Sequence, residues 1–286
     1  MSSISSTFLL FIIFLIGISI GSFLNVVIHR LPKKIFDEFK TECNESNDPQ
    51  KNNLFGLGYL IYPGSSCPSC GHRIRSWEII PIISWFLIGG KCKKCKTPIS
   101  KRYPLVEFLT GLITVFVVHF SGLNELAFWL LLFVLILIIL TVIDLEQQLL
   151  PDQLTLPLLW LGLLYHMSVG HLKLEDSIIG AIFGYIILWF VFHVFRMITG
   201  KDGMGYGDFK LLSALGAWVG WQMIPIVLVF SSISGMIFGY FLSKKKSKDN
   251  PIPFGPFLAF SGFISLIWGE KFLYMLDLII SQLQIF

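Results

Sequence analysis

Charged residues are scarce in this 286-residue chain. They make up 14% of the sequence, whereas hydrophobic residues make up 54% and the mean hydropathy is +0.73. A typical soluble domain carries about 25% charged residues. Two of the longest stretches without any charge are Leu126–Ile143 and Leu211–Leu242. Because a bilayer core needs roughly 20 apolar residues per spanning helix, this composition excludes an ordinary soluble fold and predicts an all-α polytopic membrane protein.

A cleavable secretory signal is also missing. No basic segment precedes the first apolar run, and the run continues into Gly21-Ser-Phe-Leu-Asn25 without a small-residue cleavage site. The first segment is therefore expected to remain as a helix. The long run after residue 210 exceeds one crossing, and Gly220 and Pro225 are natural points at which to divide it. A short apolar tail, 272–286, is expected to form an interfacial helix or a ninth span. The eight predicted spans are 7–28, 105–121, 126–144, 153–170, 176–198, 208–220, 223–242 and 252–268.

Basic residues indicate how the predicted bundle is oriented. With the N-terminus outside, the inward connections and their flanks hold every Lys and Arg except Lys173 and Lys271. Basic loops stay on the cytosolic side, so this orientation is the expected one. The net charge of +4 is then explained by topology and anionic lipid rather than by a nucleic-acid partner. The inward connections are 29–104, 145–152, 199–207 and 243–251.

Three regions follow from these segments. Residues 1–28 form the first transmembrane helix, 29–104 a cytosolic loop, and 105–286 a transmembrane core. The loop begins with a polar, acidic stretch from Lys33 to about Asn53, which is expected to be a mobile surface insertion.

Cysteine is rare, but four of the five cysteines are patterned. Cys67-Pro-Ser-Cys70 and Cys92-Lys-Lys-Cys95 are two C-x-x-C pairs in the same loop. This spacing predicts four thiolates around one tetrahedral, structural Zn²⁺, with free or redox-active thiols as the alternative. His72 would be the replacement ligand if one cysteine were unused, and Cys43 is expected to be a free thiol. A nucleic-acid-binding ribbon is disfavoured, because the loop is tethered to membrane helices at both ends and its lysines offset the negative charge of the site.

Two aspartates lie at the ends of predicted spans. Asp144 follows an uncharged run, and Asp208 ends the motif Gly203-Met-Gly205-Tyr-Gly207-Asp208. Helix parity places both at the same membrane face, where two carboxylates could share a proton and activate water. The plainer alternatives are that Asp208 caps its helix and that Asp144 pairs with a loop lysine. The three glycines favour close backbone approach to a substrate strand.

The order of several motifs resembles the bacterial type IV prepilin peptidase family of GxGD aspartyl proteases. Two positions depart from that pattern: Ile79 stands where Asn is usual, and Gly89 where a basic residue is common. The motifs that carry the resemblance are 21–32, the cysteine stretch 67–95, 99–107, Ile143-Asp144 with 150–157, and 203–210.

The resemblance implies a bifunctional enzyme of the bacterial inner membrane. Such enzymes cut the short basic leader from prepilins and secretion pseudopilins at the cytosolic face, then N-methylate the new N-terminus with S-adenosylmethionine. Asp144 and Asp208 match the family's catalytic pair, the four cysteines its metal site, and Gly90 a position associated with methyl transfer. The sequence itself contains no strand–glycine turn–helix unit for S-adenosylmethionine. The alternatives are a presenilin-like protease that cuts within helices and a non-enzymatic scaffold for pilus or secretion assembly.

Roles within the pair can be predicted from helix dipoles. Asp208 begins a helix and Asp144 ends one, so Asp208 is the expected base and Asp144 the expected acid. The remaining polar residues near spans are expected in quieter roles. These are Asp152 as a helix cap, Glu107 in the first turn of the second span, Glu146 in solvent, His119, His166 and His171 at the interface, and His193 in an interhelical hydrogen bond.

Overall fold

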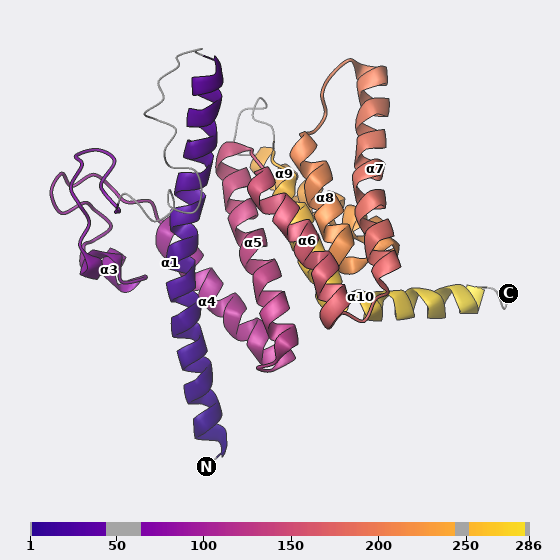
Figure 1. Ribbon diagram of the computed structural model, residues 1–286, viewed down its shortest axis with the longest axis horizontal. Helices are drawn as coiled ribbons and strands as arrows, with labels where there is room; N and C mark the ends of the chain where they lie inside the picture. Colours follow the sequence, from indigo (N-terminus) through magenta and orange to yellow (C-terminus); the bar gives the residue numbers. More distant parts are fainter. Residues whose placement is uncertain (1, 44–63, 244–251, 284–286) are drawn as a thin grey trace. The chain divides into compact units, whose positions relative to one another are not determined.

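The computed structural model describes residues 2–43, 64–243 and 252–283, and it confirms the all-α prediction (Figure 1). Within these ranges there is no β-strand, only isolated bridges in the cysteine loop. Each of the eight predicted spans lies largely within a helix. The helices are α1 (Ser2–Cys43), η1 (Ser76–Ile79), α3 (Ile83–Leu87), α4 (Arg102–Ser121), α5 (Glu125–Gln147), α6 (Asp152–Ser168), α7 (Leu174–Thr199), α8 (Tyr206–Val219), η2 (Trp221–Met223), α9 (Ile224–Ser243) and α10 (Gly255–Leu283).

Five helical segments of the described chain are long and apolar enough to cross a membrane: Thr7–Thr41, Arg102–Ser121, Glu125–Gln147, Leu174–Thr199 and Trp221–Phe241. The protein is therefore an integral membrane protein. Helix α8 has 14 residues and a length of about 21 Å, which is shorter than a hydrocarbon core of about 30 Å. Its predicted role as a spanning segment is therefore not supported by its length.

The first helix is longer than predicted. Helix α1 continues through Pro32 to Cys43, so residues 33–43 are helical rather than part of a polar insertion. Ile28 and Ile35, two turns apart, are both buried, so the buried face of α1 continues beyond residue 28. Lys34 pairs with Glu38 at 3.6 Å. The rest of the predicted insertion lies outside the described residues, as does the side chain of Cys43. The apolar tail is likewise not a separate helix, since α10 runs without a break to Leu283.

The chain divides into two compact units, Met1–Ile139 and Leu140–Phe286. In the first unit, α1 packs along α4 through glycines (Figure 1). A Cβ atom at Gly17 would lie 2.8 Å from the Gly111 Cα, and one at Gly21 would lie 2.8 Å from the Glu107 Cα. This is the small-xxx-small spacing that allows membrane helices to approach closely.

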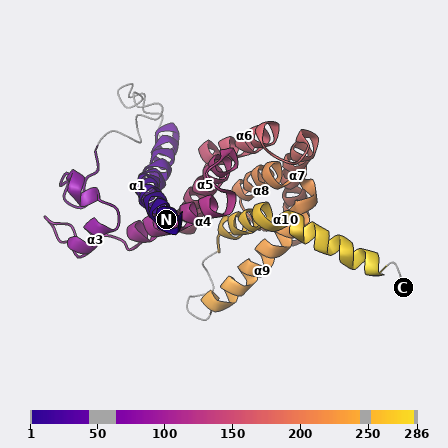
Figure 2. The same ribbon diagram turned by 90° about the horizontal axis from the view of Figure 1, so that it is seen from below.

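Helix α8 is the core of the second unit, where it contacts α6, α7, α9 and α10 (Figure 2). Its contact with α7 is made backbone to backbone, because a Cβ atom at Gly216 would overlap the carbonyl oxygen of Gly180. Two serines reinforce this contact across the helices. Ser177 donates to the Ala217 carbonyl at 2.5 Å, and Ser213 donates to the Ala181 carbonyl at 2.7 Å.

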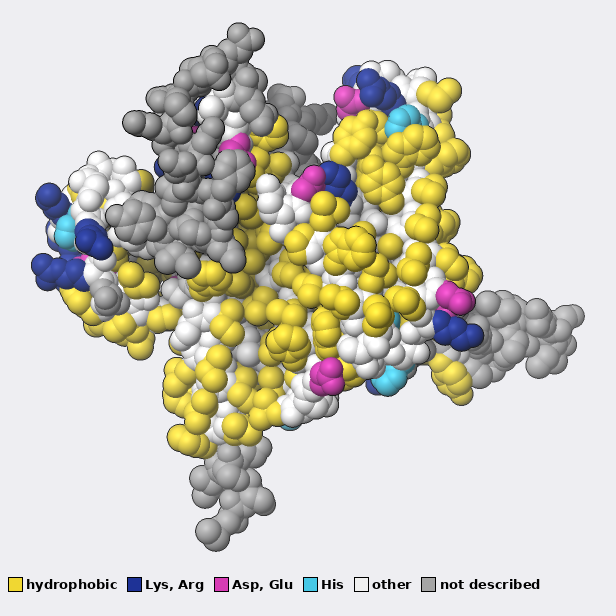
Figure 3. Space-filling model, in the orientation of Figure 1, with side chains coloured by type: hydrophobic (Ala, Val, Ile, Leu, Met, Phe, Trp, Pro, Cys, Tyr) yellow, Lys and Arg dark blue, Asp and Glu magenta, His cyan; other side chains and the backbone are white. Residues whose placement is uncertain are grey.

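Hydrophobic side chains cover much of the visible outer surface of α6 and α7 (Figure 3). On α7 these side chains include Ile178, Ile182, Ile186 and Phe190, all of them exposed. A soluble protein rarely exposes so continuous an apolar surface, which is the surface expected toward lipid.

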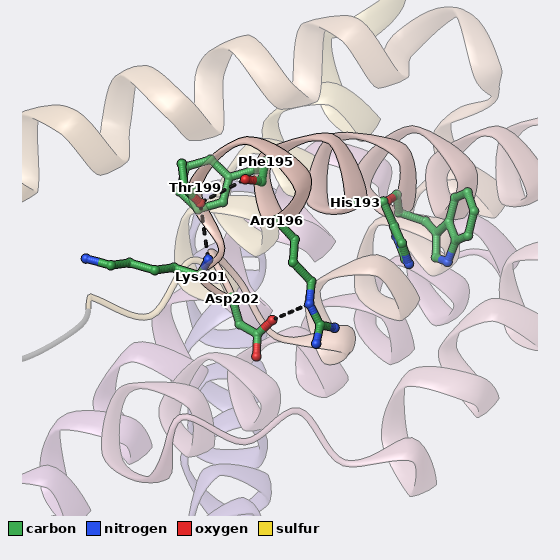
Figure 4. Close-up of polar contacts among 7 residues, drawn as sticks. His193, Phe195, Arg196, Thr199, Lys201 and Asp202 are labelled. Atoms are coloured by element: carbon green, nitrogen blue, oxygen red, sulfur yellow. Dashed lines mark hydrogen bonds and ion pairs between the residues drawn. The ribbon is translucent and has the colours of Figure 1, made fainter.

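Helix α7 ends in a turn that leads to the glycine motif (Figure 4). Gly200 adopts φ +69° at the C-cap, and Thr199 accepts a hydrogen bond from the Lys201 amide while donating to the Phe195 carbonyl. Arg196 and Asp202 form an ion pair at 3.4 Å. The predicted interhelical hydrogen bond of His193 is wrong: its Nδ1 contacts the Trp189 carbonyl of the same helix at 2.9 Å, because the ring folds back along the preceding turn.

Candidate functional site

Asp144 lies in the last turn of α5 and is buried, with 5% of its surface exposed. Within the described chain its Oδ2 has no hydrogen-bond partner and the side chain makes no ion pair, so the predicted loop-lysine pairing is absent. The backbone of Gly255, at the start of α10, closes over the carboxylate. A Cβ atom at Gly255 would lie only 2.5 Å from Oδ2. Gly255 is therefore a site residue that the sequence analysis missed.

Asp208 is the third residue of α8 and has 8% of its surface exposed. The N-cap of this helix is Gly205, and no side chain caps it. The helix-cap explanation for Asp208 is therefore not supported. The side chain lies in the first turn, where the aligned peptide dipoles favour a negative charge.

The structure brings the two aspartates together within the second unit, close enough for the charge of Asp144 to act on the Asp208 carboxylate. The nearest lysine in the sequence does not neutralise them. Lys210 is held by both carboxylate oxygens of Asp152 at 2.7 Å, and Asp152 is thus an ion-pair partner rather than the predicted cap, since Pro151 occupies the N-cap. Two buried carboxylates without a cation favour sharing a proton, which is the arrangement that activates water in aspartic proteases.

The glycines before Asp208 differ in what surrounds them. A Cβ atom at Gly203 would lie 2.8 Å from the Phe195 ring, and one at Gly207 would lie 2.8 Å from the Leu150 Cβ. These two glycines are required for packing. At Gly205 the nearest atoms are 4.0 Å away and include Asp208 Oδ2, so this backbone leaves open space beside the carboxylate. Such space is what an extended substrate strand would need.

We expect Gly255→Ala to lower the peptidase activity that the family resemblance implies by about a hundredfold while the protein still folds, because a misplacement of about 1 Å can have an effect of that size. The new methyl group would displace the Asp144 carboxylate. Gly239→Ala on α9 is a matched control, since its Cβ would meet only the end of Ile252 at 3.2 Å. Cleavage rates of a prepilin by both purified variants would decide, and equal rates would contradict the assigned position of Gly255.

Four cysteines form a metal-type cluster in the loop of the first unit. Their sulfur atoms all lie within 4.8 Å of one another, with Cys67–Cys95 at 3.7 Å and Cys70–Cys92 at 4.0 Å. A tetrahedral site with Zn–S bonds of about 2.3 Å places its sulfurs about 3.8 Å apart. The cluster therefore fits a metal such as zinc, and His72 is not part of it.

The two C-x-x-C segments have the same backbone geometry. In one, the Cys67 amide donates to the His72 carbonyl, and in the other the Cys92 amide donates to the Thr97 carbonyl, both at 2.9 Å. Hydrogen bonds from the Thr97 hydroxyl and amide lower the pKa of the Cys95 thiol to about 6. The thiolate is the form that binds metal, and Cys95 is a cysteine whose surroundings favour that form.

We expect the purified protein to contain one tightly bound metal ion, and Cys70→Ser or Cys92→Ser to lose it. Removing a ligand leaves an incomplete tetrahedral site, and structural zinc sites stabilise their folds through the metal. Elemental analysis would measure the metal, with Cys43→Ser as the control that should retain it. Full metal content in either ligand variant would contradict the assignment.

Two further predicted positions lie in the first unit. Gly90 has φ +62°, and a Cβ atom there would lie 2.7 Å from the Trp85 ring, so Gly90 allows this indole to pack. Glu107 was predicted in the first turn of its helix. It is instead the sixth residue of α4 and is buried, because the glycine contact draws α1 close to it. Its carboxylate accepts a hydrogen bond from the Ile82 amide at 2.7 Å.

In the second unit, His166 is not a simple interfacial residue, since its Nε2 bonds the Trp218 carbonyl at 2.9 Å.

An integral membrane protein with two buried aspartates at helix ends, one in a GxGD motif, has the architecture of a membrane aspartyl peptidase. Residues 15–120 match the bacterial peptidase A24 N-terminal domain, and residues 131–240 match the type IV leader peptidase family. The chain belongs to the type IV leader peptidase family.

Relatives extend this similarity over most of the chain. It is 46% identical to a prepilin leader peptidase/N-methyltransferase of Pseudomonas aeruginosa, over 90% of this chain and 89% of the relative. It is 49% identical to one from Aeromonas hydrophila, over 91% of each chain, and 45% identical to one from Dichelobacter nodosus, over 92% of each. No solved structure matches the chain significantly.

Proposed function

We propose that the protein is a prepilin leader peptidase that also N-methylates its product, with Asp144 and Asp208 as the catalytic pair. The observation that carries the peptidase assignment is the pair itself: two buried carboxylates, close enough to interact, with no cation bound to either in the described chain. This arrangement supports one proton shared between two oxygens that face a water molecule.

The positions of the two aspartates support different roles. Asp208 lies at the positive end of α8 and serves as the base that takes a proton from the attacking water. Asp144 lies at the negative end of α5, and its unbonded Oδ2 carries the proton that polarises the scissile carbonyl. The dipole contributes only about 0.3–1 kcal/mol at exposed positions, and the pair titrates as a unit. A neutron or NMR assignment of the resting proton to Asp208 would contradict this order of roles.

The substrate chemistry suits a pair at helix ends. A prepilin or secretion pseudopilin has a short polar, basic leader followed by an apolar helix, so the bond to be cut lies where the membrane meets water. The basic connections of the chain support an inner-membrane protein with this site toward the cytosol. A water molecule is available there, whereas it would be scarce at mid-bilayer.

The proposed N-methylation needs a methyl donor that the chain does not supply. S-adenosylmethionine provides an electrophilic methyl group for the new N-terminal amine. The metal of the four-cysteine site is zinc with a structural role, because four thiolates leave no open position for substrate or water. The metal site would stabilise the fold of the cysteine loop.

Incubation of the purified protein with a full-length prepilin and S-adenosylmethionine tests the proposal. Mass spectrometry should find cleavage at the leader boundary, after a glycine, and one methyl group on the new N-terminus. Cuts within the apolar helix would instead support a presenilin-like protease. An intact prepilin would support a scaffold.

A further inference from the structure

The short helix α3 of the cysteine loop has large apolar side chains on its outer as well as its inner face. The inner face packs against the rest of the loop, since Ser84 is buried and the Trp85 indole nitrogen donates to the Ile99 carbonyl at 3.3 Å. On the outer face, Phe86 is 69% and Leu87 is 72% exposed. The outer face of a helix in water is normally polar, so α3 is suited to a different environment on that side.

The exposed apolar residues continue on the N-terminal side of α3. Residues three and four apart lie on the same side of a helix, so Ile83, Phe86 and Leu87 form one stripe. Figure 3 shows hydrophobic side chains at the position of α3, with Lys and Arg side chains beside them on the same loop. Single exposed apolar residues are ordinary, but six within residues 77–87 mark an interaction surface. These six residues, the apolar surface of α3, are Trp77, Ile79, Ile80, Ile83, Phe86 and Leu87.

A hydrogen bond fixes the level of α3 along the membrane-spanning helix α4. The amide of Ile82, the residue before α3, donates to the Glu107 carboxylate at 2.7 Å. Glu107 lies five residues after Arg102, where α4 begins, and therefore about 7.5 Å along the helix axis. On these turns of α4, Leu105 and Phe108 are exposed, as lipid-facing residues would be. The start of α3 is thus level with the boundary of headgroups and acyl chains, into which interfacial helices bury their apolar face.

The turn that leads into α3 is strained. Ile82 has φ +61° and ψ −56°, and the Ile83 amide bonds the Pro81 carbonyl, which is the geometry of a γ-turn. A β-branched residue at positive φ is an outlier, and such strain persists only where surrounding contacts require it. The hydrogen bond from Ile82 to Glu107 is one such contact, so the turn holds the start of α3 beside α4.

Basic side chains accompany the apolar surface of α3. Between residues 64 and 101 the chain has one acidic residue, Glu78, and seven basic ones, all of them exposed. Lys93 lies over the Trp77 ring at 3.5 Å, so an ammonium group stands at the edge of the apolar surface of α3. Tryptophan is enriched at membrane–water interfaces, and basic groups there attract anionic headgroups. The seven basic residues are Arg73, Arg75, Lys91, Lys93, Lys94, Lys96 and Lys101.

We propose that α3 is an interfacial anchor that docks the cysteine loop on the anionic phospholipids of the bilayer. The apolar surface of α3 enters the boundary between headgroups and acyl chains, and the basic residues of the loop lie toward the phosphate groups. A lipid surface accounts for both kinds of residue, whereas a second copy of the loop would bring like charges face to face. The anchor is independent of the peptidase and methyl-transfer assignments.

Photocrosslinking of the full-length, metal-loaded protein in lipid nanodiscs tests the anchor. Benzoylphenylalanine incorporated at Phe86 should form adducts with acyl chains in nanodiscs that contain phosphatidylglycerol. Phe39 is the matched control, an aromatic residue of α1 that is 58% exposed. It lies 14 residues after Asn25, whose amide nitrogen donates to the Tyr103 carbonyl at the start of α4. This places Phe39 about 21 Å farther along the axis, in water, so position 86 should give about tenfold more lipid adduct than position 39.

The contribution of charge is tested by combining Lys91→Gln, Lys94→Gln and Lys96→Gln, with metal content as the check that the loop is folded. This variant should lower the adduct at position 86 by about threefold or more in phosphatidylglycerol nanodiscs and leave it unchanged in phosphatidylcholine nanodiscs. An unchanged adduct in both lipids would overturn the preference for anionic phospholipid. Equal lipid adducts at positions 86 and 39 would overturn the anchor itself, as would adducts from position 86 to a second copy or to another segment of the chain.

Discussion

Replacing either aspartate by asparagine should reduce prepilin cleavage by about a hundred- to ten-thousand-fold, the range that a positioned acid or base contributes. Asparagine preserves the size of each side chain but can neither release nor accept the shared proton. The two single variants should lose similar activity, and the double variant should lose little more, because the pair acts as a unit. Initial rates with a full-length prepilin in detergent would measure this.

Asp202→Asn is the matched control for these variants. Asp202 lies in the same turn before the glycine motif, is largely exposed, and pairs only with Arg196 in the part of the chain described (Figure 4). It should cleave at the wild-type rate. If Asp144→Asn or Asp208→Asn also cleaved at that rate, the catalytic pair would be wrong whatever the family resemblance. The methylation of a pre-cut pilin should survive both aspartate substitutions, because Gly90, the position that the family resemblance associates with methyl transfer, lies in the other unit.

Gly216→Val should prevent stable folding of the second unit. The new side chain would meet the Gly180 carbonyl, a backbone atom that cannot rotate away. Overpacking commonly costs about 1–3 kcal/mol and occasionally more, and a clash with a backbone belongs at the upper end. We expect a clearly lower thermal midpoint in detergent for Gly216→Ala and little folded protein for Gly216→Val.

Gly235→Ala on α9 is the control for the two Gly216 variants. Its Cβ would lie 3.4 Å from the Phe257 ring, an ordinary contact, and alanine is favoured over glycine in a helix by up to about 1 kcal/mol. Its thermal midpoint should match or exceed that of the wild type. A Gly216→Ala protein as stable as the wild type would mean that α7 and α8 do not touch at this point.

Much of the helical architecture was predictable because lipid imposes it. A charge-free run must form a helix in a bilayer, so the apolar segments of the sequence correspond to the helices observed. The division after Val219 was also predictable, since Gly220 adopts φ +80° and ends α8 there. The cysteine cluster followed from its spacing alone. The structure brings Asp144 and Asp208 close together. Their role as a catalytic pair remains a prediction.

What the sequence did not indicate depends on contacts between distant segments. Gly255 lies far from Asp144 in the chain, and only the packing of α10 against the second unit brings its backbone to the carboxylate. A clue existed, because the sequence Pro-Phe-Gly-Pro-Phe at residues 253–257 interrupts the apolar pattern. Glu107 was misplaced for the same reason. Its burial is produced by glycines on another helix, and helix periodicity alone does not reveal that contact.

The length of α1 has a consequence for how the first unit is built. A helix of 42 residues is about 63 Å long, roughly twice the thickness of a hydrocarbon core. A helix of this length extends beyond the hydrocarbon core, and its C-terminal turns, which carry Lys33, Lys34 and Lys40, have the charge that suits the aqueous side.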